Sequence, residues 1–181
     1  MPTVCRVIVG ASGSPGNLQV LRYVQHLARD CDATVVPVLA WLPPGGDLAD
    51  RRTPDEELRR IWAQDAHQRL EATLNLAWGT PPVGLLVWPL VRRGQPGPVL
   101  AGAACRPGDL LVIGAGRRGA LAWTAGGRVS RYCLAHARCP VLAVPPPPLA
   151  HQAPHRALAR AFWRRTLTTD QIPPSTRGAA A

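Results

Sequence analysis

The 181-residue chain contains no lysine, so all 21 of its basic residues are arginines. With 11 acidic residues the formal net charge is +10 at pH 7. An arginine-only basic set with abundant Ala, Pro and Gly is typical of a GC-rich coding genome, which accounts for part of this charge. The remainder would favour anionic partners. Residues 1–145 hold 16 arginines and 10 acidic residues, a charge of +6, and residues 146–181 hold 5 and 1, a charge of +4.

Long apolar runs are also missing. No run approaches the roughly 20 residues that a membrane-spanning helix needs. The first residues, from Met1 to Arg6, lack the basic segment, apolar core and cleavage site of a signal peptide. We therefore expect a cytoplasmic protein without a membrane partner.

Motifs for metal binding and catalysis are absent as well. The five cysteines are scattered and form no C-x-x-C pair, so neither a zinc site nor a redox motif is predicted. There is no G-x-S-x-G, no H-E-x-x-H and no P-loop that ends in Gly-Lys-Ser/Thr. No catalytic residue and no metal ligand is predicted, and a non-enzymatic role is favoured while an enzyme stays open. No aromatic-basic motif or recognition helix supports nucleic-acid binding.

Apolar spacing predicts strands that alternate with helices. The strands are expected at 4–10, 33–41, 83–91, 109–113 and 141–144, and the helices at 15–31, 53–78, 99–105 and 129–136. This order predicts an open five-stranded parallel sheet with helices on both faces. Ser14 is expected to cap the first helix, Thr53 and Pro54 to open the second, and Pro43 to begin a loop. Pro37 predicts an irregularity inside the second strand.

The most informative segment runs from Asp109 to Val144. It reads as a buried strand, a glycine-rich loop, a helix and a second buried strand. A strand that leads through glycines into a helix N-terminus exposes backbone N–H groups where the helix dipole favours negative charge. Arg117, Arg118 and Arg128 add positive charge there, so a phosphate or nucleotide site is predicted near residues 114–130.

This segment resembles the universal stress protein family. Nucleotide-binding members of that family carry Gly, two residues, Gly, nine residues, then Gly followed by Ser or Thr. Gly114 matches the first glycine and Gly127 the third, while Arg117 stands at the second, beside Gly116, and Arg128 stands at the Ser/Thr. The resemblance covers roughly residues 4–146 and includes the turn after the first strand, where Ser12 stands in place of the family's Asp.

The resemblance implies an adenine nucleotide alpha hydrolase-like fold, strand order 3-2-1-4-5, with a universal stress domain at 1–146. It also implies a stress-response module with a site for ATP, and Mg²⁺ with it, where the turn at Ser12 and the small residue at Ala40 lie on the adenine side. The glycine loop would hold ribose and phosphates. The residues implied for the site are Gly10, Ala11, Ser12, Ala40, Ile113, Gly114, Gly116, Arg117, Gly127, Arg128, Val129 and Ser130.

Two alternatives stay open beside nucleotide binding. One is a dimeric interaction module with a vestigial pocket, and the other is a weak ATP hydrolase. The resemblance implies a homodimer through the last strand, Val141–Val144, together with an unidentified protein partner. Four prolines, Pro145 to Pro148, end the domain. The basic tail at 147–181 is expected to be largely disordered, with a short basic amphipathic helix at 155–166 that is marginal on its own; helices of this kind can also lie on a partner.

Overall fold

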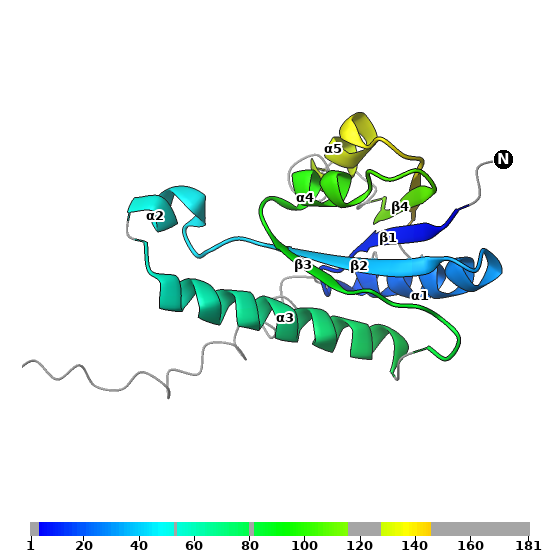
Figure 1. Cartoon of the computed structure of the whole chain (residues 1–181), viewed down its shortest axis with the longest axis horizontal. Coiled ribbons are helices and arrows are strands. Elements are labelled where there is room, and N and C mark those ends of the chain that lie inside the picture. The colour runs from blue at the N-terminus through cyan, green and yellow to red at the C-terminus, as the bar shows by residue number, and fades with distance from the viewer. Residues whose placement is uncertain (1–3, 53, 80–81, 116–127, 146–181) are drawn as a thin grey trace, which may run out of the picture. The chain divides into compact units, whose positions relative to one another are not determined.

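The computed structural model describes residues 4–52, 54–79, 82–115 and 128–145 (Figure 1). The chain divides into two compact units, Met1–Pro148 and Leu149–Ala181, and the fold below is that of the first. The last described residue is Pro145, so the predicted tail at 147–181, with its expected helix at 155–166, lies outside the described residues.

The described residues form a parallel sheet whose strands alternate with helices. The elements are β1 (Arg6–Gly10), α1 (Pro15–Asp30), β2 (Thr34–Trp41), α2 (Gly46–Arg52), α3 (Glu56–Trp78), β3 (Leu90–Arg93), α4 (Pro96–Ala103), β4 (Asp109–Gly114), α5 (Arg128–His136) and β5 (Val141–Val144). The strand order is β3-β2-β1-β4-β5, and every neighbouring pair is parallel. The predicted fold class and strand order are therefore confirmed.

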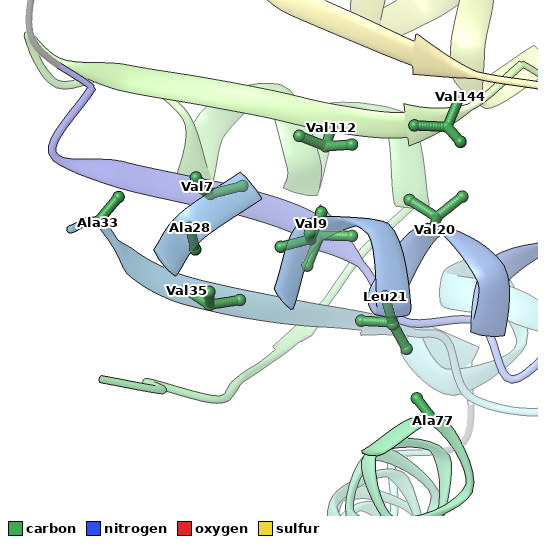
Figure 2. Packing of buried hydrophobic residues seen from close by; sticks show 11 residues of the cluster. Val7, Val9, Val20, Leu21, Ala28, Ala33, Val35, Ala77, Val112 and Val144 are labelled. Atoms are coloured by element: carbon green, nitrogen blue, oxygen red, sulfur yellow. The ribbon is translucent and has the colours of Figure 1, made fainter. Parts of the chain in front are cut away.

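Helices cover both faces of the sheet, with α1 and α3 on one side and α4 and α5 on the other (Figure 1). Alternate residues of the central strands point to opposite faces. Val7 and Val9 of β1 pack with Val20 and Leu21 of α1, as Figure 2 shows. Ile8, which lies between them in the sequence, packs on the opposite face in a cluster with α4 and α5. The apolar runs of the strands are thus buried on both sides, as a parallel sheet requires.

The second half of the sheet departs from the predicted elements. The strand expected at 83–91 is wrong for most of its length, because β3 begins only at Leu90 and an isolated bridge at Val87 precedes it. Val35 of β2 donates to the Leu86 carbonyl and accepts from the Trp88 N–H, both at 2.8 Å. Pro37, two residues along, faces the same neighbour but has no N–H to donate. Its predicted irregularity therefore falls on the β3 side, whereas pairing with β1 stays continuous.

Two helices also begin elsewhere than predicted. α3 starts at Glu56, and Asp55 caps it by accepting the Leu58 N–H at 3.0 Å, so the expected start at Pro54 is wrong. α4 runs from Pro96 and not from 99, because a proline suits the first helical turn. The region expected to be a loop after Pro43 contains the whole of α2. None of the described helices is long and apolar enough to cross a membrane.

A polar contact fixes the amino end of the sheet. The Arg6 guanidinium on β1 binds both carboxylate oxygens of Asp109 on β4, at 2.8 and 2.7 Å. The Arg106 N–H donates to the same carboxylate at 2.8 Å, and the Asp109 side chain is fully buried. Because these bonds satisfy a buried charge, they tie the turn before β4 to β1.

Candidate functional site

The candidate site lies at the carboxyl ends of β1 and β4, which are neighbours at the centre of the sheet. Val9 pairs with Val112, so the chain leaves both strands at the same level. From β1 the chain adds β2 and β3 on one side of β1 and then β4 and β5 on its other side, so the direction of strand addition reverses between β1 and β4. In open α/β sheets a ligand crevice forms at this topological switch point. Gly10 at the end of β1 and Gly114 at the end of β4 therefore lie at the switch point of the sheet.

Asn17 organises the turn after β1. Its Oδ1 accepts the backbone N–H of Ser12 at 2.8 Å and of Gly13 at 3.3 Å, and its Nδ2 donates to the Gly10 carbonyl. The turn donors nearest the crevice are therefore bonded to a protein side chain. Asn17 was missed in the sequence analysis, although an Asn shortly after a Ser cap commonly binds nearby backbone.

Ser12 and Ser14 present the hydroxyls of this turn. Ser14 caps α1, as predicted, because its Oγ accepts the Asn17 N–H at 3.3 Å. The Ser12 side chain is exposed, and its Oγ lies 3.2 Å from that of Ser14. Gly13 adopts φ of +70°, and a Cβ there would lie 3.1 Å from Thr73 Oγ1 on α3. The turn is thus held in one conformation, with the Ser12 hydroxyl exposed and bonded only to that of Ser14 among the described residues.

The end of β4 and the start of α5 form the other wall. The Ser130 hydroxyl donates to the Gly114 carbonyl at 2.8 Å, and the Ala115 N–H donates to the Val144 carbonyl at 2.8 Å. The first residue of α5 is Arg128, whose side chain is exposed and makes no hydrogen bond or ion pair with the described residues. A positive side chain at a helix N-terminus interacts unfavourably with the helix dipole, and a bound anion would offset this repulsion.

The remaining predicted residues differ in what they can offer. Ile113 is 4% exposed and Val129 packs on the same cluster, so their side chains belong to the core on the α4 and α5 side. Ala11 is buried under α3 and donates its N–H to the Val38 carbonyl at 2.8 Å. Ala40 is half-buried on β2. Gly116, Arg117 and Gly127, which make up most of the glycine motif, lie outside the described residues.

The described walls carry backbone groups, serine hydroxyls and one guanidinium. Residues 10–17, 113–115 and 128–130 contain no carboxylate, histidine or cysteine. A general base or nucleophile of those types is therefore missing from these segments. Among the described residues no group of three or more His, Cys, Asp or Glu side chains could hold a metal ion.

Carboxylates do occur further along the same edge, on α2, but they are engaged. The Asp50 side chain is 2% exposed and lies 2.9 Å from Arg59 Nε and 2.8 Å from Arg93 Nη2. Asp47 pairs with the same Arg93 at 2.7 Å. The hydrogen bond from Arg59, and then that from Arg93, hold the pKa of Asp50 below its ordinary value in spite of burial. These groups attach α2 to β3 and α3 and are not free to bind a cation.

Comparisons with known proteins agree with this fold. The family model of the universal stress protein family matches residues 4–145. A comparison with curated proteins gave no match.

Solved structures share the fold at low sequence identity. A universal stress protein in complex with cAMP is 20% identical and gives a TM-score of 0.52, with 80% of this chain and 99% of that chain covered. UspA from Lactobacillus plantarum is 18% identical with a TM-score of 0.58, and the match covers 80% of this chain and 99% of that chain. A hypothetical protein whose biochemical function was assigned from its structure is 16% identical with a TM-score of 0.62, and the match covers 80% of this chain and 98% of that chain. With the family model spanning the whole described domain, this chain belongs to the universal stress protein family.

Proposed function

We propose that this universal stress protein is a non-catalytic module that binds an adenine nucleotide at the carboxyl ends of β1 and β4. One observation carries the proposal. Arg128 places an exposed guanidinium with no partner among the described residues at the first position of α5, beside the end of β4. A phosphate at this point would meet both a helix N-terminus and a bidentate donor.

The proposed ligand divides between the two walls. The base would lie toward Gly10, Ala11, Ser12 and Ala40, and the ribose and phosphates toward Ile113, Gly114, Gly116, Arg117, Gly127, Arg128, Val129 and Ser130. The Ser12 hydroxyl can make one hydrogen bond to a base as donor or acceptor, and it brings no charge. The similar fold of a universal stress protein in complex with cAMP supports an adenine nucleotide as the class of ligand.

ATP and a cyclic nucleotide make different demands on this site. ATP would bring Mg²⁺, which favours oxygen ligands and commonly takes them from phosphates and water. Because no carboxylate is present on the described walls, the phosphates would have to supply the metal's anionic ligands. A cyclic monophosphate carries a single negative charge that one arginine can neutralise. Titrations with both ligands separate the two cases.

The test is calorimetric titration of the full chain with ATP and Mg²⁺, and separately with cAMP. Wild-type protein is expected to bind one of them in the micromolar range. Since a hydrogen bond to a charged group contributes about 1.5–3 kcal/mol, Arg128→Ser should weaken binding by about tenfold or more. The control is Arg138→Ser, which removes an exposed arginine beyond the other end of α5.

The proposal is contradicted if the wild-type protein shows no heat of binding with either ligand. Tighter binding by Arg128→Ser would mean that the arginine fills the space that a serine leaves open, and that the frame of the pocket survives. If the wild type and both variants bind nothing, the dimeric interaction module remains. Asn17 favours that second candidate, because it already occupies two backbone donors of the turn.

Dimerisation through β5 is part of the proposal. β5 is an edge strand of the sheet, and Ala143 on it is exposed. An unpaired edge is prone to unwanted association, and pairing with a symmetry mate removes it. The proposed dimer is isologous, with each β5 lying beside that of the second copy.

A further inference from the structure

The opposite edge of the sheet carries large apolar side chains that are open to solvent. The segment from Pro82 to Val91 runs beside β2 and ends in β3, which is the outermost strand. On it Val83 is 92% exposed, Leu86 75% and Trp88 73%. Exposed apolar residues that stand singly are ordinary, but three within six residues along one sheet edge form a patch. We refer to Val83, Leu86 and Trp88 as the edge patch.

The two larger members of the edge patch lie on the same side of the extended segment. Leu86 and Trp88 flank the bridge between Val87 and Val35, and residues two apart in extended chain share a face. Leu85, of the opposite parity, packs inward against the α1 cluster. A partly open hollow of about 170 Å³ adjoins the patch and is lined by Leu85 and Leu86 together with Arg29 and Asp32. The hollow lies on the α1 side of the segment, so the projecting side chains of Leu86 and Trp88 are the part of the patch that a partner would contact.

The backbone of this edge is protected against strand pairing. Trp88 donates its N–H inward to Val35, so the next residue, Pro89, turns its nitrogen outward. A proline there offers no donor to an approaching strand. Edge strands commonly use proline in this way to prevent backbone pairing between molecules. A partner at this edge would therefore contact side chains and would not extend the sheet.

Charge indicates which partner fits. Residues 72–91 contain no charged side chain, whereas residues 1–145 as a whole carry a charge of +6; charged groups flank this stretch, with Arg92 and Arg93 at the end of β3 and Arg29 and Asp32 at the hollow. Two copies of so cationic a domain repel each other wherever their arginines meet, and an uncharged stretch of the edge around Leu86 and Trp88 is a place where they can approach. An acidic partner would be attracted to the arginines and not to this edge. A symmetric contact places the same apolar patch on both sides.

We propose that the edge patch is a self-association surface, by which a second copy of this chain packs Leu86 and Trp88 against the same residues. This contact is separate from the proposed β5 dimer, because β3 and β5 form opposite edges of one sheet. A chain with both contacts associates beyond a dimer, either as a closed tetramer or as an open chain of copies.

The experiment measures the mass of the full chain in solution by light scattering after size exclusion, over a range of micromolar concentrations. The test variants are Trp88→Arg and Leu86→Arg, which put like charges into the contact. Leu48→Arg is the matched control, since it adds the same charge at a leucine that is 74% exposed on α2. Ala143→Arg, at an exposed position of β5, tests the other edge separately.

The expected result is that Trp88→Arg and Leu86→Arg lose association that wild type and Leu48→Arg retain. If the β5 dimer also exists, each edge variant falls to a dimer and the Trp88→Arg, Ala143→Arg double variant to a monomer. If the edge patch acts alone, Ala143→Arg keeps the wild-type mass and Trp88→Arg is a monomer. A monomeric wild type, or a Trp88→Arg variant with unchanged mass, overturns the proposal.

A second measurement guards against an unfolded variant. Leu86→Arg and Leu86→Asp each place equal charges in a symmetric contact, but a mixture of the two places opposite charges there. Association should be weak in each variant alone and return on mixing. Failure of the mixture to associate, with both variants folded by circular dichroism, contradicts a symmetric contact at Leu86.

Discussion

The Ser130 hydroxyl donates a hydrogen bond of 2.8 Å to the Gly114 carbonyl, and so joins the start of α5 to the end of β4. These two residues are 16 positions apart and lie on the two sides of the glycine loop. Ser130 was predicted as a ligand residue, and its hydroxyl oxygen can still accept a hydrogen bond while it donates one. Its protein contact sets where α5 begins relative to the crevice.

Replacing Ser130 by alanine should therefore affect both stability and binding. Loss of the hydrogen bond is expected to lower the free energy of unfolding by about 1 kcal/mol. Denaturant unfolding measures it. Ser12→Ala is the control, because the Ser12 hydroxyl is exposed and contacts only that of Ser14 among the described residues; it should change stability by less than about 0.5 kcal/mol. Equal losses in the two variants would contradict the role assigned to Ser130.

Close packing of α4 on α5 predicts opposite effects for two glycines of one helix. A Cβ on Gly97 would lie 2.8–2.9 Å from atoms of Tyr132 on α5, whereas a Cβ on Gly102 would meet nothing within 4 Å. Gly97→Ala should destabilise the protein by about 1–3 kcal/mol through overpacking. Gly102→Ala should stabilise it by about 0.5–1 kcal/mol, since alanine is the better helix former. Thermal unfolding of both distinguishes packing from helix propensity, and a stabilised Gly97→Ala would show that α5 moves freely.

The sequence predicted the central strands because local signals and burial agree there. Ser14 before the apolar spacing of α1 indicates a cap, and Val7 to Val9 form a run that is buried on both faces. The prediction of a strand at 83–91 was wrong because strand pairing depends on the partner strand. Pro37 withholds a donor from that side, which the apolar residues of the segment itself do not reveal.

The same limit applies to α2 and to the site. Gly45 and Gly46 suggest a loop, and α2 is held by Arg59 of the next helix and by Arg93, which lies 43 positions from Asp50 in sequence. Gly114 ends a buried strand at the switch point, so its place at this edge of the sheet could be predicted, whereas its part in ligand binding stays a prediction. The role of Asn17 depends on the position of the Gly10 carbonyl, which only the folded chain provides.

The ion pairs on α2 predict that Arg93 controls the order of that helix. Arg93→Gln removes the bonds to Asp47 and Asp50 and leaves the buried Asp50 with Arg59 alone. Amide hydrogen exchange across residues 46–52 should become roughly fivefold faster, with little change in β1. Arg92→Gln, at the adjacent exposed residue, is the control and should leave exchange in α2 unaltered. Unchanged exchange in Arg93→Gln would mean that packing alone holds α2.

The buried pair of Arg6 and Asp109 predicts a pH-dependent difference in stability. Burial raises the pKa of the Asp109 carboxyl, but the hydrogen bonds from Arg6 and the Arg106 N–H, with the attraction of both arginines, bring it below the ordinary 3.8. A carboxyl with a lowered pKa in the folded state contributes stability that is complete above its unfolded pKa. That contribution is lost as the pH falls from there through the folded pKa.

Arg6→Met isolates the stability that the Arg6–Asp109 pair contributes, because all other carboxylates titrate equally in the wild type and in the variant. The variant leaves Asp109 buried without its cation and should lose about 3 kcal/mol near neutral pH. Without Arg6, burial favours the neutral carboxyl, so the deficit should shrink as the pH falls below about 4. Urea unfolding at about pH 7 and pH 3 measures the difference. Arg138→Met, at an exposed arginine without a partner among the described residues, should show a small difference that is equal at both values. A deficit in Arg6→Met that is independent of pH would mean that the arginine acts through packing of its aliphatic stem and not through its charge.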